Sequence, residues 1–369
     1  MKPRDRILAA IELREPDRVP LFDLAVSQVV IEKLTGMKVR ASILTETTTE
    51  AVTQEEFDKV IEAHIKLGLD GIAFFALTNA AKNMPLDEYT YVDEWGRIFS
   101  RKVRAGTMSD FYVGGYLTTP EKYEQFPRPD PYDPFRVEQY KKAVKAAGDK
   151  LYIIPTAGSI YEYPVRGIGD ENVCRYAYKN PQFLEKVFKD SAFYTTEVGK
   201  QFIEEGAEVL FIFEDYAYKH GPFLHPKLWR KLVFPRLKEV VDAFHKRGAL
   251  VLVHSDGNIL PLMDMIVEAG VDGVHSLEPA AGIDLAYVKE KWGDKLCLIG
   301  NIDVGNLLPY GSEEEVVREV KRAIRSAAPG GGYILSTCSA VTDMCKPENY
   351  SAMLSAGRKY GKYPSASSP

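Results

Sequence analysis

The feature that most constrains this chain is a repeated alternation of short apolar runs with longer amphipathic stretches. The runs are nearly continuous in hydrophobic residues, a pattern typical of strands that are buried on both faces in a parallel sheet. Parallel strands need crossover connections, and the amphipathic stretches are long enough to supply them as helices. The predicted strands cover residues 18–24, 71–75, 151–156, 209–214, 250–254, 273–277, 296–301 and 333–338.

The amphipathic stretches carry helix start and stop signals. Pro181 suits a first helical turn, and Ser312 with Glu315 forms a capping box. Pro235 should kink or split the helix in which it lies. The clearest predicted helices cover residues 181–205, 226–247, 260–269 and 312–328. Eight strands with crossover helices predict an α/β fold, a single (β/α)8 TIM barrel.

The first half of the chain carries insertions within this predicted barrel. Residues 38–55 form one insertion, and residues 89–104 have the pattern of a hairpin that turns at Gly96. Residues 120–134 are predicted to be a proline-rich loop. We expect one domain over residues 1–363 and a disordered tail over residues 364–369.

Composition excludes several classes of function. The net charge is −5 and there is no basic tract, so nucleic-acid binding is not expected. No run of about 18 apolar residues is present, so we expect no membrane span. The four cysteines are widely scattered, which favours a reducing cytoplasm over a disulfide framework. No glycine-rich nucleotide-binding motif occurs.

In a barrel of this kind the active site lies where the strands end at their carboxyl termini. The segment LVLVHSDGN places His254 and Asp256 two residues apart at such an end, so their side chains should point the same way. Cys338 ends the last predicted strand. An imidazole, a carboxylate and a thiolate are suitable ligands for a catalytic zinc. The alternatives are a hydrogen-bonded structural histidine, an ordinary Asp-Gly turn and a buried cysteine.

Other polar and aromatic residues follow the predicted strands. Glu214 and Asp215 are candidates for general acid/base catalysis, or else form a helix N-cap and an ion pair. A group of residues at strand ends is predicted to bind a flat substrate, although each aromatic side chain alone is also explained by packing. The predicted substrate-binding residues are Tyr161, Tyr163, Phe213, Tyr216 and Asn301.

Several motifs in order resemble the uroporphyrinogen decarboxylase superfamily. They are RDRILAAIELREPDRVP at the start, DEWG at 93–96, GNID at 300–303 and CSAVTDMCKPENY at 338–350. Together they cover nearly the whole chain. The decarboxylases of this superfamily have an Arg-rich segment near the N-terminus and an Asp after an early strand. Here the corresponding strand reads GIAFFALTNA, and the Arg-rich segment is missing, so decarboxylation of a porphyrinogen is disfavoured.

The chain is more similar to the corrinoid-dependent methyltransferases of the superfamily, which have a His-x-Cys pair on one strand and a distant Cys on the last. His254 and Cys338 match this pattern, whereas Asp256 stands where the first Cys is expected. A carboxylate leaves zinc a stronger Lewis acid than a second thiolate would, which suits an ether oxygen.

The resemblance therefore implies a zinc-dependent O-demethylase of the kind associated with methanogenesis. It would move a methyl group from a small, methoxylated aromatic substrate to the cobalt of a corrinoid, or cobalamin, carried by a partner protein. The resemblance also allows a homodimer. Two alternatives are a transferase that moves methyl from methylcobalamin to a thiol such as coenzyme M, and a lyase similar to uroporphyrinogen decarboxylase.

Overall fold

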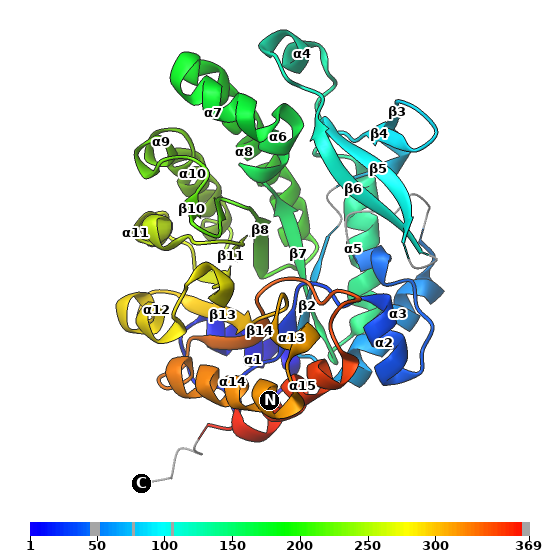
Figure 1. The fold of residues 1–369 in the computed structure, drawn as a ribbon, viewed down its shortest axis with the longest axis vertical. Coiled ribbons are helices and arrows are strands. Elements are labelled where there is room, and N and C mark those ends of the chain that lie inside the picture. The colour runs from blue at the N-terminus through cyan, green and yellow to red at the C-terminus, as the bar shows by residue number, and fades with distance from the viewer. Residues whose placement is uncertain (45–51, 76–77, 105–106, 364–369) are drawn as a thin grey trace.

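The computed structural model describes residues 1–44, 52–75, 78–104 and 107–363. An eight-stranded parallel sheet forms a barrel, and helices surround it (Figure 1). The predicted (β/α)8 barrel is thus confirmed. In sheet order the strands are β1 (Phe22–Asp23), β2 (Gly71–Phe74), β7 (Tyr152–Gly158), β8 (Val209–Phe213), β11 (Leu250–Ser255), β12 (Gly273–Ser276), β13 (Cys297–Ile302) and β14 (Tyr333–Thr337).

The first and last strands meet and close the barrel. Leu21 and Leu335 form a parallel bridge, and the Leu335 amide donates to the carbonyl of Pro20 at 3.0 Å. The first strand is shorter than the predicted range of 18–24. Pro20 explains part of this difference, because proline has no amide hydrogen to offer a neighbouring strand.

The helices lie where the amphipathic stretches predict them. Pro235 does divide the predicted helix over 226–247, with the break at Val233. The capping box of Ser312 and Glu315 is formed. The helices are α1 (Pro3–Ile11), α2 (Gln28–Thr35), α3 (Gln54–Leu67), α4 (Pro120–Gln125), α5 (Pro134–Ala147), α6 (Glu162–Ile168), α7 (Asp170–Lys179), α8 (Pro181–Glu204), α9 (Pro226–Leu232), α10 (Phe234–His245), α11 (Met263–Glu268), α12 (Leu285–Trp292), α13 (Leu307–Tyr310), α14 (Glu313–Ala327) and α15 (Pro347–Tyr360).

Short elements occupy several of the loops. Four are 3-10 helices, and two form a small antiparallel pair after β8. They are η1 (Ala41–Leu44), η2 (Ala80–Lys82), η3 (Leu260–Leu262), η4 (Pro279–Ala281), β9 (Ala217–Tyr218) and β10 (Gly221–Pro222). No helix in the described ranges is both long and apolar enough to cross a membrane. Residues 45–51 of the first predicted insertion and the predicted tail at 364–369 lie outside the described residues.

An antiparallel sheet is inserted between β2 and β7, and it lies beside the barrel (Figure 1). Its strands are β3 (Met84–Pro85), β4 (Thr90–Val92), β5 (Arg97–Arg104) and β6 (Thr107–Gly115). The predicted hairpin that turns at Gly96 is therefore confirmed, since β4 and β5 pair antiparallel. The predicted loop over 120–134 is partly wrong. Its start is the helix α4, because Pro120 fits the first turn and the Thr119 side chain caps the Lys122 amide.

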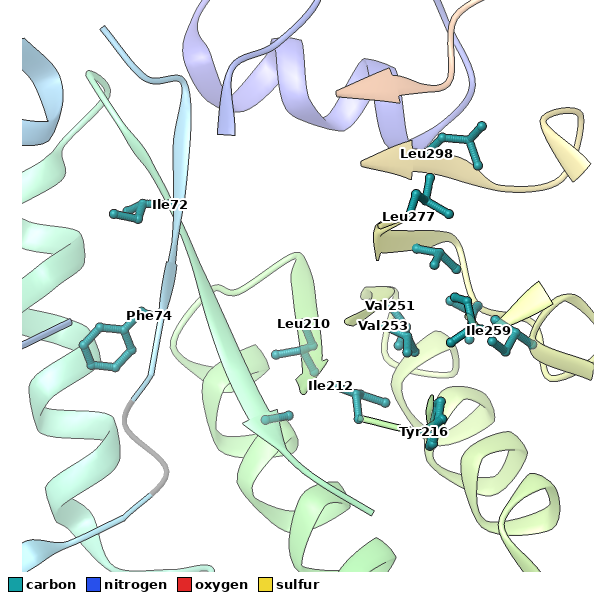
Figure 2. Close-up of a cluster of buried hydrophobic side chains, with 14 of the residues drawn as sticks. Ile72, Phe74, Leu210, Ile212, Tyr216, Val251, Val253, Ile259, Leu277 and Leu298 are labelled. Carbon is teal, nitrogen blue, oxygen red and sulfur yellow. The ribbon is translucent and has the colours of Figure 1, made fainter. Parts of the chain in front are cut away.

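The barrel strands have a hydrophobic layer on each face, because successive side chains point to opposite faces. Figure 2 shows outward-facing residues, such as Leu210 and Ile212 of β8 and Val251 and Val253 of β11, which belong to the core beneath the helices. The alternate positions fill the barrel interior, which α1 also packs against through Ile7, Ala10 and Ile11. The interior core consists of Phe22, Leu24, Ala73, Phe75, Ile154, Val209, Phe211, Leu252, Cys297, Ile299 and Ile334.

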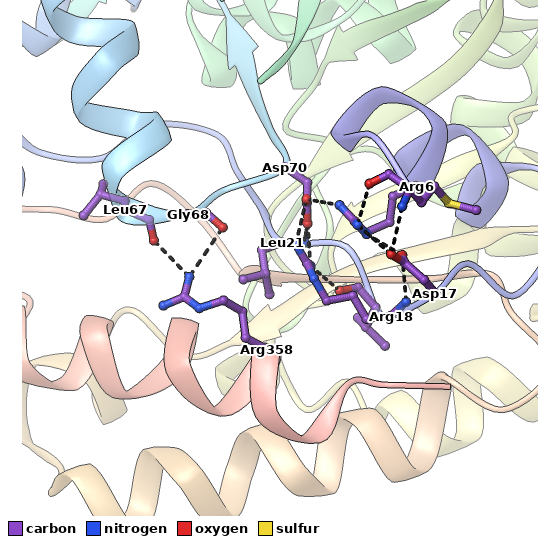
Figure 3. Close-up of polar contacts among 10 residues, drawn as sticks. Arg6, Asp17, Arg18, Leu21, Leu67, Gly68, Asp70 and Arg358 are labelled. Atoms are coloured by element: carbon purple, nitrogen blue, oxygen red, sulfur yellow. Dashed lines mark hydrogen bonds and ion pairs between the residues drawn. The ribbon is translucent and has the colours of Figure 1, made fainter. Parts of the chain in front are cut away.

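A group of ion pairs closes the amino-terminal end of the barrel (Figure 3). Asp70, which is 2% exposed, accepts hydrogen bonds from Arg6 at 2.6 Å, from Arg18 at 2.7 and 2.9 Å, and from the Leu21 amide at 2.8 Å. Asp17 accepts from Arg6 at 2.7 and 2.8 Å. Each oxygen of the buried Asp70 carboxylate is therefore satisfied by protein donors.

Candidate metal centre

A layer of polar side chains lies above the interior core, at the carboxyl end of the barrel. The alternation along β11 places His254 on the same inner face as Leu252. On β12 the inner position is taken by His275, whose ring packs edge-on against Phe22 and Phe211. Both imidazoles are buried, with 1% and 0% of their surface exposed.

Three of these side chains form a cluster that could hold a metal ion. One ligand atom from each of Asp215, His254 and Asp256 lies within 4.8 Å of the others. The His254 Nε2 atom is 3.8 Å from Asp215 Oδ1 and 3.7 Å from Asp256 Oδ1. Two donors that are each about 2.0–2.1 Å from a tetrahedral ion are separated by roughly 3.4 Å. The two distances from His254 therefore need to shorten by only a few tenths of an ångström for a zinc-sized cation to bridge the imidazole and each carboxylate.

The environment of Asp256 supports this interpretation. Its Oδ2 atom accepts from Ser339 at 3.2 Å, and its amide donates to Asp215 Oδ1 at 3.0 Å. Its Oδ1 atom is buried and has no hydrogen-bond partner among the described residues. Burial raises the pKa of Asp256, and the nearby Asp215 raises it further, while His254 opposes both. A cation between these groups would satisfy the orphaned oxygen and offset the repulsion of the two carboxylates.

The cluster is reached from solvent through its carboxylates. The Asp215 and Asp256 side chains are 22% and 35% exposed, whereas His254 is almost entirely buried beneath them. The two acidic residues follow β8 and β11 in the loops at the barrel mouth. The imidazole of His254 lies near the carboxyl end of β11 itself. A cation held here would be fixed from below and open above, as a catalytic site requires.

The other ring nitrogen of His254 faces inward and contacts His275. The two Nδ1 atoms are 2.8 Å apart, and the Nε2 atom of His275 lies 3.0 Å from the carbonyl of Thr337 and 3.2 Å from Ser336 Oγ. Burial and the neighbouring His254 hold the pKa of His275 well below its ordinary value.

A buried carboxylate supports the end of β14 beneath this pair. Asp23 accepts from the Thr337 amide at 3.0 Å, from the Thr337 hydroxyl and from the Tyr350 hydroxyl at 2.5 Å. Its contact with Ser336 Oγ is longer, at 3.3 Å. Burial raises the pKa of Asp23 to about 6, against the lowering effect of these hydrogen bonds.

Glu214 and Asp215 have different positions despite being adjacent. Glu214 faces outward and is fully buried, and its carboxylate accepts from the amides of Ile160, Tyr161 and Glu162 at the start of α6 and from the Ser159 hydroxyl. This geometry favours the helix-cap interpretation for Glu214. Burial raises its pKa to about 7, although these donors lower it. Asp215, predicted as a second acid/base residue, lies in the cluster with His254 and Asp256.

The predicted substrate-binding aromatics separate into two groups. Phe213 faces the interior and stacks on His254, with ring centroids 4.3 Å apart and planes at 22°. Phe75 meets Phe213 edge-on at 5.0 Å. The three tyrosines are instead buried outside the barrel: Tyr161 packs on Phe188 of α8, Tyr163 on Trp95, and Tyr216 on Trp229 of α9. Only Phe213 of this group therefore contacts the cluster.

The remaining predicted residues lie deeper or to one side. Asn301 is buried on β13 and donates to the Leu277 carbonyl at 3.1 Å. Cys338 does not belong to the cluster formed by His254 and Asp256, since Asp215 is the third member. Burial raises the pKa of the Cys338 thiol, which is hydrogen-bonded to the backbone of Val304. The structure thus brings together two of the three predicted ligands.

Sequence comparison places the chain in a family. Residues 99–360 match the model of the family described as "Uroporphyrinogen decarboxylase (URO-D)". The chain belongs to the uroporphyrinogen decarboxylase family. Among curated relatives of the family, the uroporphyrinogen decarboxylase of Alkalilimnicola ehrlichii is 25% identical over 248 residues, which cover 63% of this chain and 64% of the relative. The chain therefore spans a little under two thirds of that relative. The Chlorobium phaeovibrioides enzyme is 20% identical over 88% of both chains.

A solved structure extends the similarity over the whole barrel. A methyltransferase from Methanosarcina mazei superposes with a TM-score of 0.73 at 19% identity, covering 98% of this chain and 99% of the other. At this level of identity the similarity establishes the fold. The family and the fold expected from the sequence motifs are thereby confirmed.

Proposed function

We propose that this chain is a metal-dependent methyltransferase that takes a methyl group from a methoxylated aromatic substrate and passes it to the cobalt of a corrinoid carried by a partner protein. The observation that carries the proposal is the cluster of Asp215, His254 and Asp256 at the barrel mouth. Its open carboxylates, buried imidazole and orphaned oxygen fit a divalent cation, for which zinc is the first candidate.

A bound divalent cation would supply Lewis acidity toward the ether oxygen, whose bond to the methyl carbon must break. Asp215 and Asp256 would hold that cation from the solvent side, and His254 would hold it from the buried side. The Ser339 hydroxyl orients Asp256 through its Oδ2 atom. In the proposed transfer the methyl carbon passes to cobalt(I), and the substrate leaves as a phenolate that takes up a proton.

The aromatic wall beside His254 supports an aromatic substrate. Phe213 lies parallel to the imidazole, and Phe75 stands edge-on to it, so an apolar surface adjoins the cluster. Flat rings bind such surfaces by offset stacking or edge contacts. A substrate ring placed there would bring its methoxy oxygen toward the carboxylate side of the cluster.

The donor set favours an ether over a thiol as the group that binds. The cluster contributes two carboxylates and one imidazole, and no thiolate. Hard oxygen donors leave a cation more electrophilic toward oxygen, whereas thiolate-rich sites suit sulfur chemistry. This distinguishes the proposal from transfer of methyl to a thiol, for which the cluster has no matching feature.

The direct test supplies the zinc-loaded protein with cob(I)alamin and a methoxylated benzoate and follows methylcobalamin by its visible spectrum. We expect methylcobalamin to form, and Asp256→Ala to reduce the rate to that of chelator-treated protein. Asp242→Ala is the matched control, because this exposed carboxylate pairs with Lys238 on α10 and lies on the surface. It should retain the full rate.

Two further reactions distinguish the alternatives. Consumption of methylcobalamin with a thiol, in the absence of any ether reaction, would assign the chain to thiol methylation. Release of carbon dioxide from uroporphyrinogen would assign it to the lyase activity named for its curated relatives. Either result without ether cleavage would contradict the proposed function.

A further inference from the structure

We infer that His275 is a positioning residue that holds His254 in the tautomer with its proton on Nδ1, so that the Nε2 lone pair is presented to the cation. The inference rests on the proposed metal site and concerns how that site is prepared. His275 itself lies below the cluster and contacts the cation's ligand rather than the cation.

The proton positions follow from the partners of each nitrogen. The Thr337 carbonyl can only accept a hydrogen bond, and it lies 3.0 Å from His275 Nε2. The His275 Nε2 atom must therefore carry a hydrogen. A neutral imidazole has only one N–H, so the Nδ1 atom of His275 is an acceptor.

The same reasoning fixes the position of the proton on the His254 ring. The two Nδ1 atoms are 2.8 Å apart, which is a hydrogen-bond distance and requires one donor and one acceptor. Because His275 Nδ1 accepts, His254 Nδ1 must donate. A His254 ring that donates through Nδ1 can present its Nε2 lone pair to a cation, and this Nε2 atom lies 3.8 and 3.7 Å from Asp215 and Asp256. Metal-binding histidines commonly donate their second N–H to a fixed partner in this way.

The partner is itself held rigidly. Phe22 and Phe211 contact the His275 ring at 6.3 and 6.0 Å between centroids, both edge-on. The carbonyl that fixes its proton belongs to Thr337, whose amide and hydroxyl are bound by Asp23. The support therefore runs from β1 through β14 and β12 to the ligand on β11. Each step is a buried hydrogen bond between neighbouring or facing strands.

An isosteric pair of substitutions isolates the acceptor. His275→Asn places a carbonyl oxygen where Nδ1 stood, whereas His275→Leu has nearly the same shape and no acceptor. Both variants lose the hydrogen bond to Thr337. If only packing mattered, their zinc affinities should therefore fall by the same factor. Competition with a chromophoric chelator measures their Zn²⁺ affinities. We expect His275→Leu to bind zinc about 10–100-fold more weakly than wild type, and His275→Asn within about threefold of it.

A second buried histidine provides the control. His64 on α3 is 1% exposed and bonds the Val60 carbonyl, away from the cluster. His64→Phe should leave zinc affinity unchanged. Equal affinities for wild type and His275→Leu would overturn the inference, as would equal losses in the Leu and Asn variants. A wild-type protein that binds no zinc would instead refute the metal site and the proposed function together.

A spectroscopic measurement tests the tautomer without any substitution. In protein with ¹⁵N-labelled histidine and bound ¹¹³Cd²⁺, the inference predicts coupling between cadmium and His254 Nε2, and a hydrogen on His254 Nδ1. The chain has six histidines, so the ring signals can be assigned. Coupling of cadmium to Nδ1 would overturn the inference even if neither variant of His275 folds.

Discussion

Each end of the barrel contains a carboxylate with a buried oxygen, and the two differ in exposure and in how that oxygen is satisfied: Asp70 is 2% exposed, whereas the Asp256 side chain is 35% exposed. At the amino-terminal end Asp70 accepts four hydrogen bonds, three of them from arginines. At the carboxyl end Asp256 has a second carboxylate and an imidazole as neighbours, and its Oδ1 atom has no partner within the described ranges. The amino-terminal end satisfies its carboxylate with protein donors alone, whereas the carboxyl end leaves one oxygen without a partner among the described residues, which the proposed cation would satisfy.

This difference separates stability from function. An unpaired buried charge is costly, so a fold keeps it only where another component compensates. The arginine cluster of Figure 3 provides that compensation within the chain, and also ties α1 to the barrel. At the barrel mouth, the proposed cation would provide this compensation for Asp215 and Asp256.

The largest effect is expected from Asp70→Ala. The substitution leaves Arg6 and Arg18 without their buried partner, and we expect a loss of about 3–5 kcal/mol in the free energy of unfolding. Urea denaturation of the metal-free protein measures it. Zinc affinity should not change, because this network lies at the opposite end. A weakened zinc site in the folded variant would show that the two ends are not independent.

The next effect is a pH dependence that comes from Asp23. Burial raises its pKa from 3.8 to about 6, so the folded state binds this proton more tightly than the unfolded state. Its stabilising contribution is complete below about pH 3.8 and is lost as the pH rises through 6, by about 3 kcal/mol in total. The difference in unfolding free energy between wild type and Asp23→Asn should therefore fall from pH 4 to pH 7.5. A constant difference would contradict this.

In metal-free protein, Asp256→Ala should raise the free energy of unfolding, whereas Asp70→Ala should lower it. Removing Asp256 Oδ1, an acceptor that lacks a partner, relieves a desolvation cost. We therefore expect the free energy of unfolding to rise by about 1 kcal/mol. With zinc at about 100 times its Kd, wild type should gain about 2.7 kcal/mol and the variant almost nothing. Thermal unfolding with chelator and with zinc measures both. A destabilised metal-free variant would mean that the cluster is complete without a cation.

The smallest effect is expected on the surface of α10. Arg236 pairs with Glu239 at 2.7 Å, and their side chains are 28% and 57% exposed. We expect Arg236→Ala to change the free energy of unfolding by about 0.5 kcal/mol or less. A loss comparable to that of Asp70→Ala would show that burial is not what distinguishes the ion pairs at the amino-terminal end.

The sequence predicts the barrel well because each strand is buried on both faces. Strands such as β8 and β11 are continuous apolar runs, and their limits agree with prediction to within a residue. The inserted sheet was only partly predicted. Its last strand, β6, was not predicted: its apolar Phe111 and Val113 are exposed, 37% and 54%, so they mark no core-facing side, and the strand lies at the sheet edge beside β5.

The sequence predicts the site residues wherever the two-residue alternation of a strand continues beyond its carboxyl end. His254 and Asp256 share a face, as their spacing indicates. The same period from Phe213 places Asp215 inward and Glu214 outward, so it contained the signal that separates their roles. The same reasoning fails at Cys338, which follows the last strand but is not among the three residues whose ligand atoms form the cluster.

His275 was missed for a different reason. Within the segment GVHS it interrupts an apolar strand, where a histidine is indistinguishable from a core residue with a local hydrogen bond. Its importance comes from His254 on the neighbouring strand, and this contact depends on the register of β11 and β12. A single sequence does not determine that register.

X-ray absorption at the zinc edge of the zinc-loaded protein distinguishes ligand atoms by distance, and so measures whether Asp215, His254 and Asp256 bind the ion. Ligation by Asp215, His254 and Asp256 predicts a first shell of nitrogen and oxygen only, at about 2.0–2.2 Å, with the outer-shell scattering of one imidazole. A sulfur at about 2.3 Å would place Cys338 on the ion and contradict the ligand set described here.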